Sequence, residues 1–126
     1  PVGHTVVSST STLCKLVSWN NEGLLKGNGE ELLMHQCDWL SYLLHGIEGA
    51  TDYNNALKLG YDPDPSLGNG EGGYPSWLTE QPFASALPEL VYPPGKPIAH
   101  VQQNVASTLG LPLTAQVCAG TTDSIA

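Results

Sequence analysis

The sequence predicts a domain of the α/β class. Three observations carry this prediction: segments in the first half show the apolar spacing of helices, the last third alternates strand, helix and strand patterns, and the 126 residues suffice to bury one core. The alternation in the last third further predicts a parallel pair of strands joined by a right-handed crossover.

Composition excludes several classes of partner. Only 4 basic residues stand against 12 acidic ones, a formal net charge of −8, so no cationic surface is available for nucleic acid or an anionic membrane. No apolar run approaches the roughly 20 residues that cross a bilayer. With 40% hydrophobic and 13% charged residues, the chain is predicted to be globular and soluble.

The chain is predicted to begin with a strand and a helix. Residues 3–7 fit a short strand, and the hydroxyl side chains that follow them suit the start of a helix over 13–19. Leu13, Leu16 and Val17 stand at positions i, i+3 and i+4, so they should form one buried stripe on this helix.

A second helix is predicted between Asp38, as its N-terminal cap, and Gly46, which ends it. Before it, residues 32–34 fit a short buried strand. The apolar residues of the helix recur at helical spacing and are expected to face the core: Trp39, Leu40, Leu43 and Leu44.

A third helix is expected from Asp52 to about residue 59, with Thr51 or Asp52 as its cap and Gly60 after its end. Because the cap position explains Asp52, we interpret this carboxylate as structural rather than as a contact to substrate.

Residues 60–97 contain eight of the ten prolines and six glycines, which excludes long regular elements. Short apolar clusters within them favour an ordered loop pinned to the core, and a disordered linker is the alternative. The G-x-G-x-G-G pattern at 68–73 follows no apolar strand and contains Glu71, whose charge would repel phosphate. A phosphate-binding loop is therefore not expected there.

The last third is predicted as strands at 97–101 and 114–119 on either side of a helix over 103–109, which Gly110 ends. The next turn then follows the carboxyl end of a strand, where open α/β sheets bind ligands. Asp123 lies in this turn, and two roles are open to it. It could cap a following helix, or it could act as a general base toward a substrate hydroxyl.

Cysteine and histidine usage gives weaker signals. The three cysteines are an odd number without a C-x-x-C pair, so reduced thiols are expected, with Cys37 and Cys118 as small core residues. Four potential metal ligands lie near the second helix: His35, Cys37, Asp38 and His45. Their spacing scatters them around the helix axis, so no metal site is expected. Trp39, Tyr42 and Trp77 are expected to pack in the core.

Four segments, in order along the chain, resemble motifs of the FGGY carbohydrate kinases. Thr12, Lys15, Leu16 and Trp19 resemble T-x-x-K-L-x-W with one additional residue before the Trp. The other three are Asp38-Trp39-Leu40 with Leu44 and Gly46, similar to D-Y-L-x-x-x-L-x-G; Thr51-Asp52 with Asn55-Ala56, similar to T-D-x-S-N-A except that Asn54 replaces Ser or Thr; and 119–126, similar to A-G-x-x-D-x-x-A.

The resemblance covers nearly the whole chain and is to the D-ribulose kinase and xylulose kinase-like branch. It implies a partial ribonuclease H-like lobe of the actin and hexokinase class, with a mixed sheet and flanking helices. It also implies transfer of the ATP γ-phosphoryl group to a sugar hydroxyl, a pentulose by branch, with Mg²⁺ spreading the charge. Asp123 would be the catalytic base, and Gly120, Thr121 and Thr122 would line the path of sugar and phosphate.

The family binds ATP and Mg²⁺ mainly through a D-x-G-T hairpin and an adenosine-binding lobe that these residues do not include. The resemblance therefore implies the second half of an N-terminal lobe, inactive alone, whose intact enzyme binds sugar and ATP and could form a homodimer. A cytoplasmic location is expected, or a plastid if a transit peptide precedes the chain. Two alternatives stay open: a non-catalytic truncated product, and an unrelated α/β binding module that acts through a partner.

Overall fold

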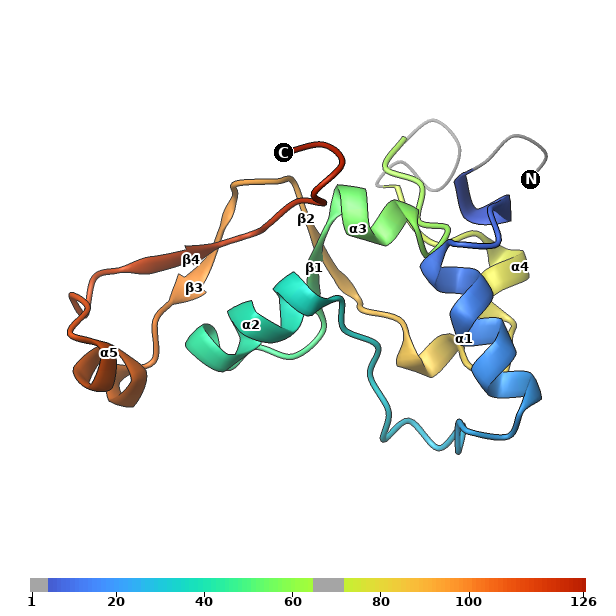
Figure 1. Ribbon diagram of the computed structural model, residues 1–126, viewed down its shortest axis with the longest axis horizontal. Helices are drawn as coiled ribbons and strands as arrows, with labels where there is room; N and C mark the ends of the chain where they lie inside the picture. The colour runs from blue at the N-terminus through green and yellow to red at the C-terminus, as the bar shows by residue number, and fades with distance from the viewer. Residues whose placement is uncertain (1–4, 65–71) are drawn as a thin grey trace. The chain divides into compact units, whose positions relative to one another are not determined.

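The computed structural model describes residues 5–64 and 72–126, in which helices and short strands form a small α/β fold (Figure 1). Two compact units divide it: unit 1 comprises the chain up to Leu33 and Asn55–Leu87, and unit 2 comprises Met34–Asn54 and Pro88–Ala126. The general α/β class predicted from the sequence is confirmed. None of the helices in the described residues is long and apolar enough to span a membrane.

Unit 1 contains α1 (Thr12–Asn21), which starts one residue earlier than predicted. The hydroxyl of Ser11 caps it by accepting the Cys14 N–H at 3.3 Å, and the same hydroxyl donates to the Val6 carbonyl at 2.9 Å. The buried apolar cluster of this unit comprises Val6, Leu13, Leu16, Leu59, Leu78, Phe83 and Leu87. Val17 was expected in the buried stripe but is exposed.

Two predicted strands of the first half are wrong. Thr5–Val7 is the 3-10 helix η1, because the Val6 carbonyl bonds the Ser11 hydroxyl instead of a neighbouring strand; residues 3 and 4 lie outside the described residues. The segment 32–34 forms no strand either. In this segment the Leu33 N–H donates a backbone hydrogen bond to the Ala86 carbonyl at 2.7 Å. A single bond of this kind does not make the repeated pairing of a β-ladder.

The Gly/Pro-rich segment forms short elements where the structure describes it. These are α4 (Ser76–Thr79), the 3-10 helix η3 (Ala84–Ala86) and the strand β2 (Leu90–Tyr92). Leu78 and Leu87 are buried and attach the segment to the core of unit 1, as predicted for an ordered loop. Asp62 and Gly73 pair through two backbone hydrogen bonds of 2.9 and 2.8 Å. Most of the G-x-G-x-G-G pattern lies outside the described residues.

Unit 2 contains the strands. β1 (Ala50–Asp52) pairs in parallel with β2 (Leu90–Tyr92), with Ala50 opposite Leu90 and Asp52 opposite Tyr92. β3 (Pro97–His100) pairs with β4 (Gln116–Cys118) in a separate two-stranded sheet. Neither β1 nor β2 was predicted. The apolar cluster of this unit comprises Val101, Ala106 and Val117, with Leu44, Val105 and Ala115 packed against it.

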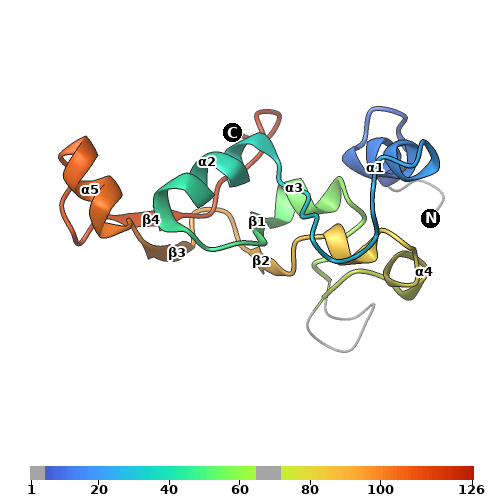
Figure 2. The same ribbon diagram turned by 90° about the horizontal axis from the view of Figure 1, so that it is seen from below.

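The predicted parallel pairing of the last two strands is wrong, because β3 and β4 are antiparallel. The helix between them, α5 (Gln103–Leu109), has the predicted bounds and ends at Gly110 in the left-handed conformation. It lies beyond the end of the β3–β4 ladder in both views (Figure 2). A crossover helix needs a broad apolar stripe to cover a sheet face, and α5 packs only Val105 and Ala106.

The second predicted helix is observed as α2 (Gln36–His45), closed by Gly46 in the left-handed conformation as expected. Its cap is the backbone of His35, so Asp38 lies inside the first turn rather than before it. The predicted buried face is wrong for three of four residues. Trp39, Leu40 and Leu43 are 50%, 50% and 46% exposed.

The third predicted helix is shorter than expected. It is observed as α3 (Tyr53–Leu57), because residues 50–52 pair with β2 as strand β1 before the helix begins. Gly60 follows with a φ of 94°, a conformation that favours glycine.

Candidate functional site

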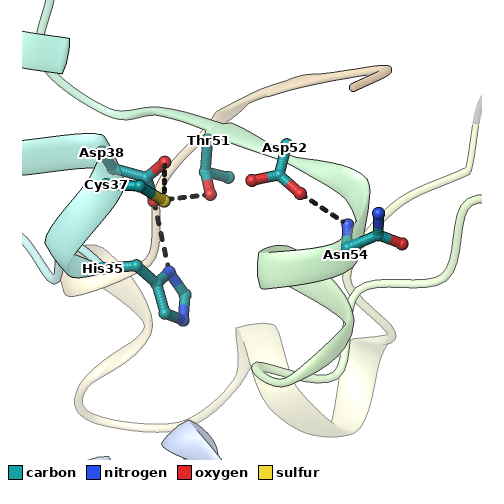
Figure 3. Close-up of polar contacts among 6 residues, drawn as sticks. All are labelled: His35, Cys37, Asp38, Thr51, Asp52 and Asn54. Atoms are coloured by element: carbon teal, nitrogen blue, oxygen red, sulfur yellow. Dashed lines mark hydrogen bonds and ion pairs between the residues drawn. The ribbon is translucent and has the colours of Figure 1, made fainter. Parts of the chain in front are cut away.

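The polar side chains that could carry chemistry gather in unit 2 around the start of α2, the strand β1 and the turn after β4. His35, Cys37 and Asp38 come from the start of α2, and Thr51 and Asp52 come from β1 (Figure 3). Asn54 from α3 links this group to the turn at Gly120 and Thr121.

Asp38 is the most constrained carboxylate of the site. It is 7% exposed, and its Oδ2 accepts a hydrogen bond from the Thr51 hydroxyl at 2.7 Å. The same oxygen lies 3.2 Å from His35 Nδ1, and Oδ1 accepts from Cys37 Sγ at 3.7 Å. A position in the first turn of α2 also favours a negative charge there.

Asp52 is fully buried, and its Oδ1 accepts the Asn54 N–H at 2.9 Å. This confirms the predicted cap of α3 and leaves Thr51, the other candidate cap, to bond Asp38 instead. In Figure 3 the second oxygen of Asp52 points toward the side on which Asp38 and Cys37 lie.

Cys37, Asp38 and Asp52 form a group that sequence spacing did not identify. One ligand atom from each, a thiol sulfur and two carboxylate oxygens, lies within 4.8 Å of the others. Spacing along α2 suggested that the potential ligands on this helix point in different directions. The three ligand atoms come together because β1 places Asp52 beside Cys37 and Asp38. His45 lies at the other end of α2, where its Nδ1 accepts the Ile47 N–H at 2.9 Å.

The turn singled out from the sequence borders this group. Thr121 Oγ1 accepts a hydrogen bond from Asn54 Nδ2 at 2.8 Å, and a Cβ added at Gly120 would lie 3.7 Å from Cys37 Sγ. Thr122 is buried, with its hydroxyl 2.8 Å from that of Ser124. Gly120 and Thr121 therefore lie on the side of the turn that borders Cys37 and Asn54.

Asp123 lies on the exposed side of this turn, and its Oδ1 accepts the Ser124 N–H at 2.9 Å. Residues 123–125 make a single turn, in which the Thr122 carbonyl accepts the N–H groups of Ile125 and Ala126, both at 3.1 Å. The strand before it belongs to an antiparallel pair, so the turn does not follow the carboxyl edge of a parallel sheet. Its carboxylate is accessible to a ligand from solvent.

His45 is a buried titratable group outside this cluster. Desolvation by burial lowers the pKa of its imidazole below the ordinary value. Nδ1 accepts the Ile47 N–H, whereas Nε2 has no hydrogen-bond partner among the described residues.

The cysteines are all free thiols, as predicted. Cys37 is half-buried, but Cys118 is exposed, so its expected place in the core is wrong. Trp39 and Trp77 are also exposed rather than packed inside.

No known family model matches this chain. The function is therefore argued from the residues and geometry of this site.

Proposed function

We propose that this chain is part of an ATP-dependent carbohydrate kinase of the FGGY type, within a partial ribonuclease H-like lobe. The enzyme would transfer the γ-phosphoryl group of ATP to a hydroxyl of a pentulose, D-ribulose or D-xylulose. One observation carries the proposal: three of the four segments that resemble the family's motifs meet in unit 2. The Thr51–Asp38 hydrogen bond joins two of them, and the Asn54–Thr121 bond joins the third.

This convergence supports the proposal because a chance resemblance between short segments places no constraint on where they lie. The bonded residues are 13 and 67 positions apart in sequence, yet the bonds are 2.7 and 2.8 Å long. Asn54 stands where the family has Ser or Thr, and its longer amide is the group that reaches Thr121.

Asp123 is the proposed general base. Its exposed carboxylate would accept the proton of the sugar hydroxyl as the hydroxyl oxygen attacks the γ-phosphorus. The bond from that phosphorus to the β,γ-bridging oxygen breaks, and ADP leaves. Gly120, Thr121 and Thr122 line the proposed path of sugar and phosphate.

The residues around this turn fit a limited role toward Mg²⁺. The turn 120–123 offers one carboxylate, that of Asp123. An ion held chiefly by substrate phosphates requires no more than this from one segment. We propose that the remaining ATP and Mg²⁺ contacts come from a D-x-G-T hairpin and an adenosine lobe outside these 126 residues.

The experiment is a coupled assay of ADP formation with D-ribulose and D-xylulose. It uses the longest chain that the source transcript encodes around these residues. Asp123→Asn should lower turnover about 10²- to 10⁴-fold, because the hydroxyl proton loses its acceptor. Glu89→Gln, at another exposed carboxylate of unit 2, should retain the parent rate.

An Asp123→Asn enzyme that runs at the parent rate removes Asp123 from the mechanism. Absence of ADP formation with both sugars overturns the kinase proposal. The second candidate would then stand: a non-catalytic module that acts through a partner. The exposure of Trp39, Leu40 and Leu43 on α2 favours that candidate, because contiguous apolar side chains at a surface mark contact sites.

A further inference from the structure

We propose that Cys37, Asp38 and Asp52 form a binding site for a divalent transition-metal ion, with Zn²⁺ as the best fit to their chemistry. The site is distinct from the proposed ATP-linked Mg²⁺ and does not depend on the kinase proposal. It joins the first turn of α2 to the end of β1 within unit 2.

The separations between the donor atoms are close to those of a metal centre. Zn–S bonds of about 2.3 Å and Zn–O bonds of about 2.0–2.2 Å place tetrahedral ligand atoms roughly 3.3–3.7 Å apart. Cys37 Sγ and Asp38 Oδ1 are 3.7 Å apart, and all three ligand atoms lie within 4.8 Å of one another. For the most widely separated pair, closure around an ion therefore requires a movement of about 1.5 Å at most.

The remaining oxygens of both carboxylates are fixed by hydrogen bonds, as in metal sites with an organised outer shell. Asp38 Oδ2 is held by Thr51 and His35, and Oδ1 lies toward Cys37. Asp52 Oδ1 is held by the Asn54 N–H, and the other oxygen points toward the group in Figure 3. One oxygen of each carboxylate is thus oriented toward the same place.

Burial adds an electrostatic argument for a cation. Asp52 is 0% exposed and Asp38 is 7% exposed, and like charges this close in a poorly solvated place repel each other. A divalent ion between the two carboxylates converts this repulsion into attraction.

The mixed donor set selects the class of metal. A thiolate with two carboxylates suits borderline ions such as Zn²⁺ or Co²⁺, whereas Mg²⁺ and Ca²⁺ require oxygen ligands throughout. Three protein ligands leave a fourth tetrahedral position for water. Gly120 borders the sulfur, since a Cβ there would lie 3.7 Å from Cys37 Sγ.

Cobalt is the probe for the first experiment, because Co²⁺ bound to a thiolate shows a sulfur-to-metal charge-transfer band in the near ultraviolet. The metal-free, reduced 126-residue chain is titrated with Co²⁺, and Zn²⁺ is then added in competition. We expect the band to saturate at one equivalent, to disappear on addition of Zn²⁺ and to be insensitive to Mg²⁺. Cys37→Ser should abolish the band, and Asp52→Asn should weaken Co²⁺ binding at least about tenfold.

The matched controls remove the same chemical groups elsewhere. Cys118→Ser deletes an exposed thiol and Glu89→Gln deletes an exposed carboxylate, both in unit 2, and both should bind Co²⁺ like the parent. A parent chain without the band, or a band that survives Cys37→Ser, overturns the proposal.

A second measurement needs no variant and so holds even where a substitution impairs folding. The parent chain is alkylated with iodoacetamide with and without Zn²⁺, and each cysteine is followed by peptide mass spectrometry. Zn²⁺ should slow the alkylation of Cys37 at least about tenfold and leave Cys14 and Cys118 unchanged. Equal rates at Cys37 with and without Zn²⁺ contradict a site there, whatever the outcome of the kinase assay.

Discussion

At the scale of single residues, Asp38 depends on a partner that lies 13 positions away. The Thr51 hydroxyl donates to its buried carboxylate, and Thr51 itself is 1% exposed. Both groups leave water on folding, so the bond between them offsets a desolvation cost.

Thr51→Val should therefore destabilise unit 2 by about 1–3 kcal/mol, because it keeps the shape of the side chain but removes the donor to Asp38. Hydrogen exchange of the α2 amides, followed by NMR, reports this loss locally. Thr79→Val removes an exposed hydroxyl from α4 and should change exchange by less than about 0.5 kcal/mol. Equal effects at the two positions would contradict a special role for the Thr51 bond.

His45 should make stability depend on pH. Burial lowers its pKa in the folded chain, so the unfolded chain binds a proton more readily. The stability contributed by neutral His45 is present above the unfolded pKa near 6.5 and is lost as pH falls through the lowered folded pKa. Protonation also removes the Nδ1 acceptor of the Ile47 N–H.

The melting temperature of the parent should thus fall more steeply from about pH 7.5 to about pH 5.5 than that of His45→Asn, whose side chain does not titrate. His100→Gln, at an exposed histidine of β3, should keep the parent's pH dependence. Identical curves for the parent and His45→Asn would show that His45 does not carry the effect.

At the scale of elements, the backbone pair between Asp62 and Gly73 in unit 1 depends on the glycine beside it. Gly72 has a φ of 72°, and a Cβ there would lie 2.8 Å from the Asp62 carbonyl oxygen and 3.2 Å from Pro63 backbone atoms. Backbone atoms cannot rotate away as a side chain can, so only glycine fits beside the Asp62–Gly73 pair.

Gly72→Ala should be more destabilising than Gly29→Ala by about 1–3 kcal/mol. Both glycines have a similar positive φ, but a Cβ at Gly29 meets nothing within 4 Å. The shared cost of the left-handed conformation cancels in the comparison, which leaves the steric term. Urea denaturation followed by circular dichroism measures both variants, and equal losses would mean that the Asp62 backbone yields.

At the scale of the whole molecule, each unit has its own apolar cluster, whereas the length of the chain suggested one core. Smaller clusters leave more apolar surface uncovered. On α2 only Leu44 packs against the cluster of unit 2, and its neighbours Leu40 and Leu43 are about half exposed.

The double change Leu40→Gln with Leu43→Gln should lower the binding of a hydrophobic fluorescent dye and any self-association, with little loss of stability. Leu44→Gln on the same helix should instead destabilise unit 2, because it places an amide against Val101 and Val117. Dye fluorescence and sedimentation report the exposed apolar surface that the double variant removes, and thermal melting reports the loss of stability expected for Leu44→Gln. Unchanged dye binding in the double variant would show that these side chains are covered in solution.

The sequence by itself determined the ends of several helices. Gly46 after α2 and the bounds of α5 with Gly110 are as predicted. The cap of α1 is Ser11, one of the run of hydroxyl residues predicted to precede this helix, and α1 starts one residue earlier than predicted. A cap depends on a hydroxyl, a carboxylate or a glycine within a few positions of the backbone groups that it satisfies, so the local sequence contains the necessary information.

Only the tertiary structure decided strand pairing, burial on α2 and the cluster of Cys37, Asp38 and Asp52. The sequence pattern of β3, α5 and β4 suited a parallel crossover, but the narrow apolar face of α5 left the strands to pair antiparallel. Asp38 accepts a hydrogen bond from Thr51, 13 positions away, and Asn54 donates one to Thr121, 67 positions away. Such contacts depend on how distant segments pack, and the periodicity of a single segment carries no information about them.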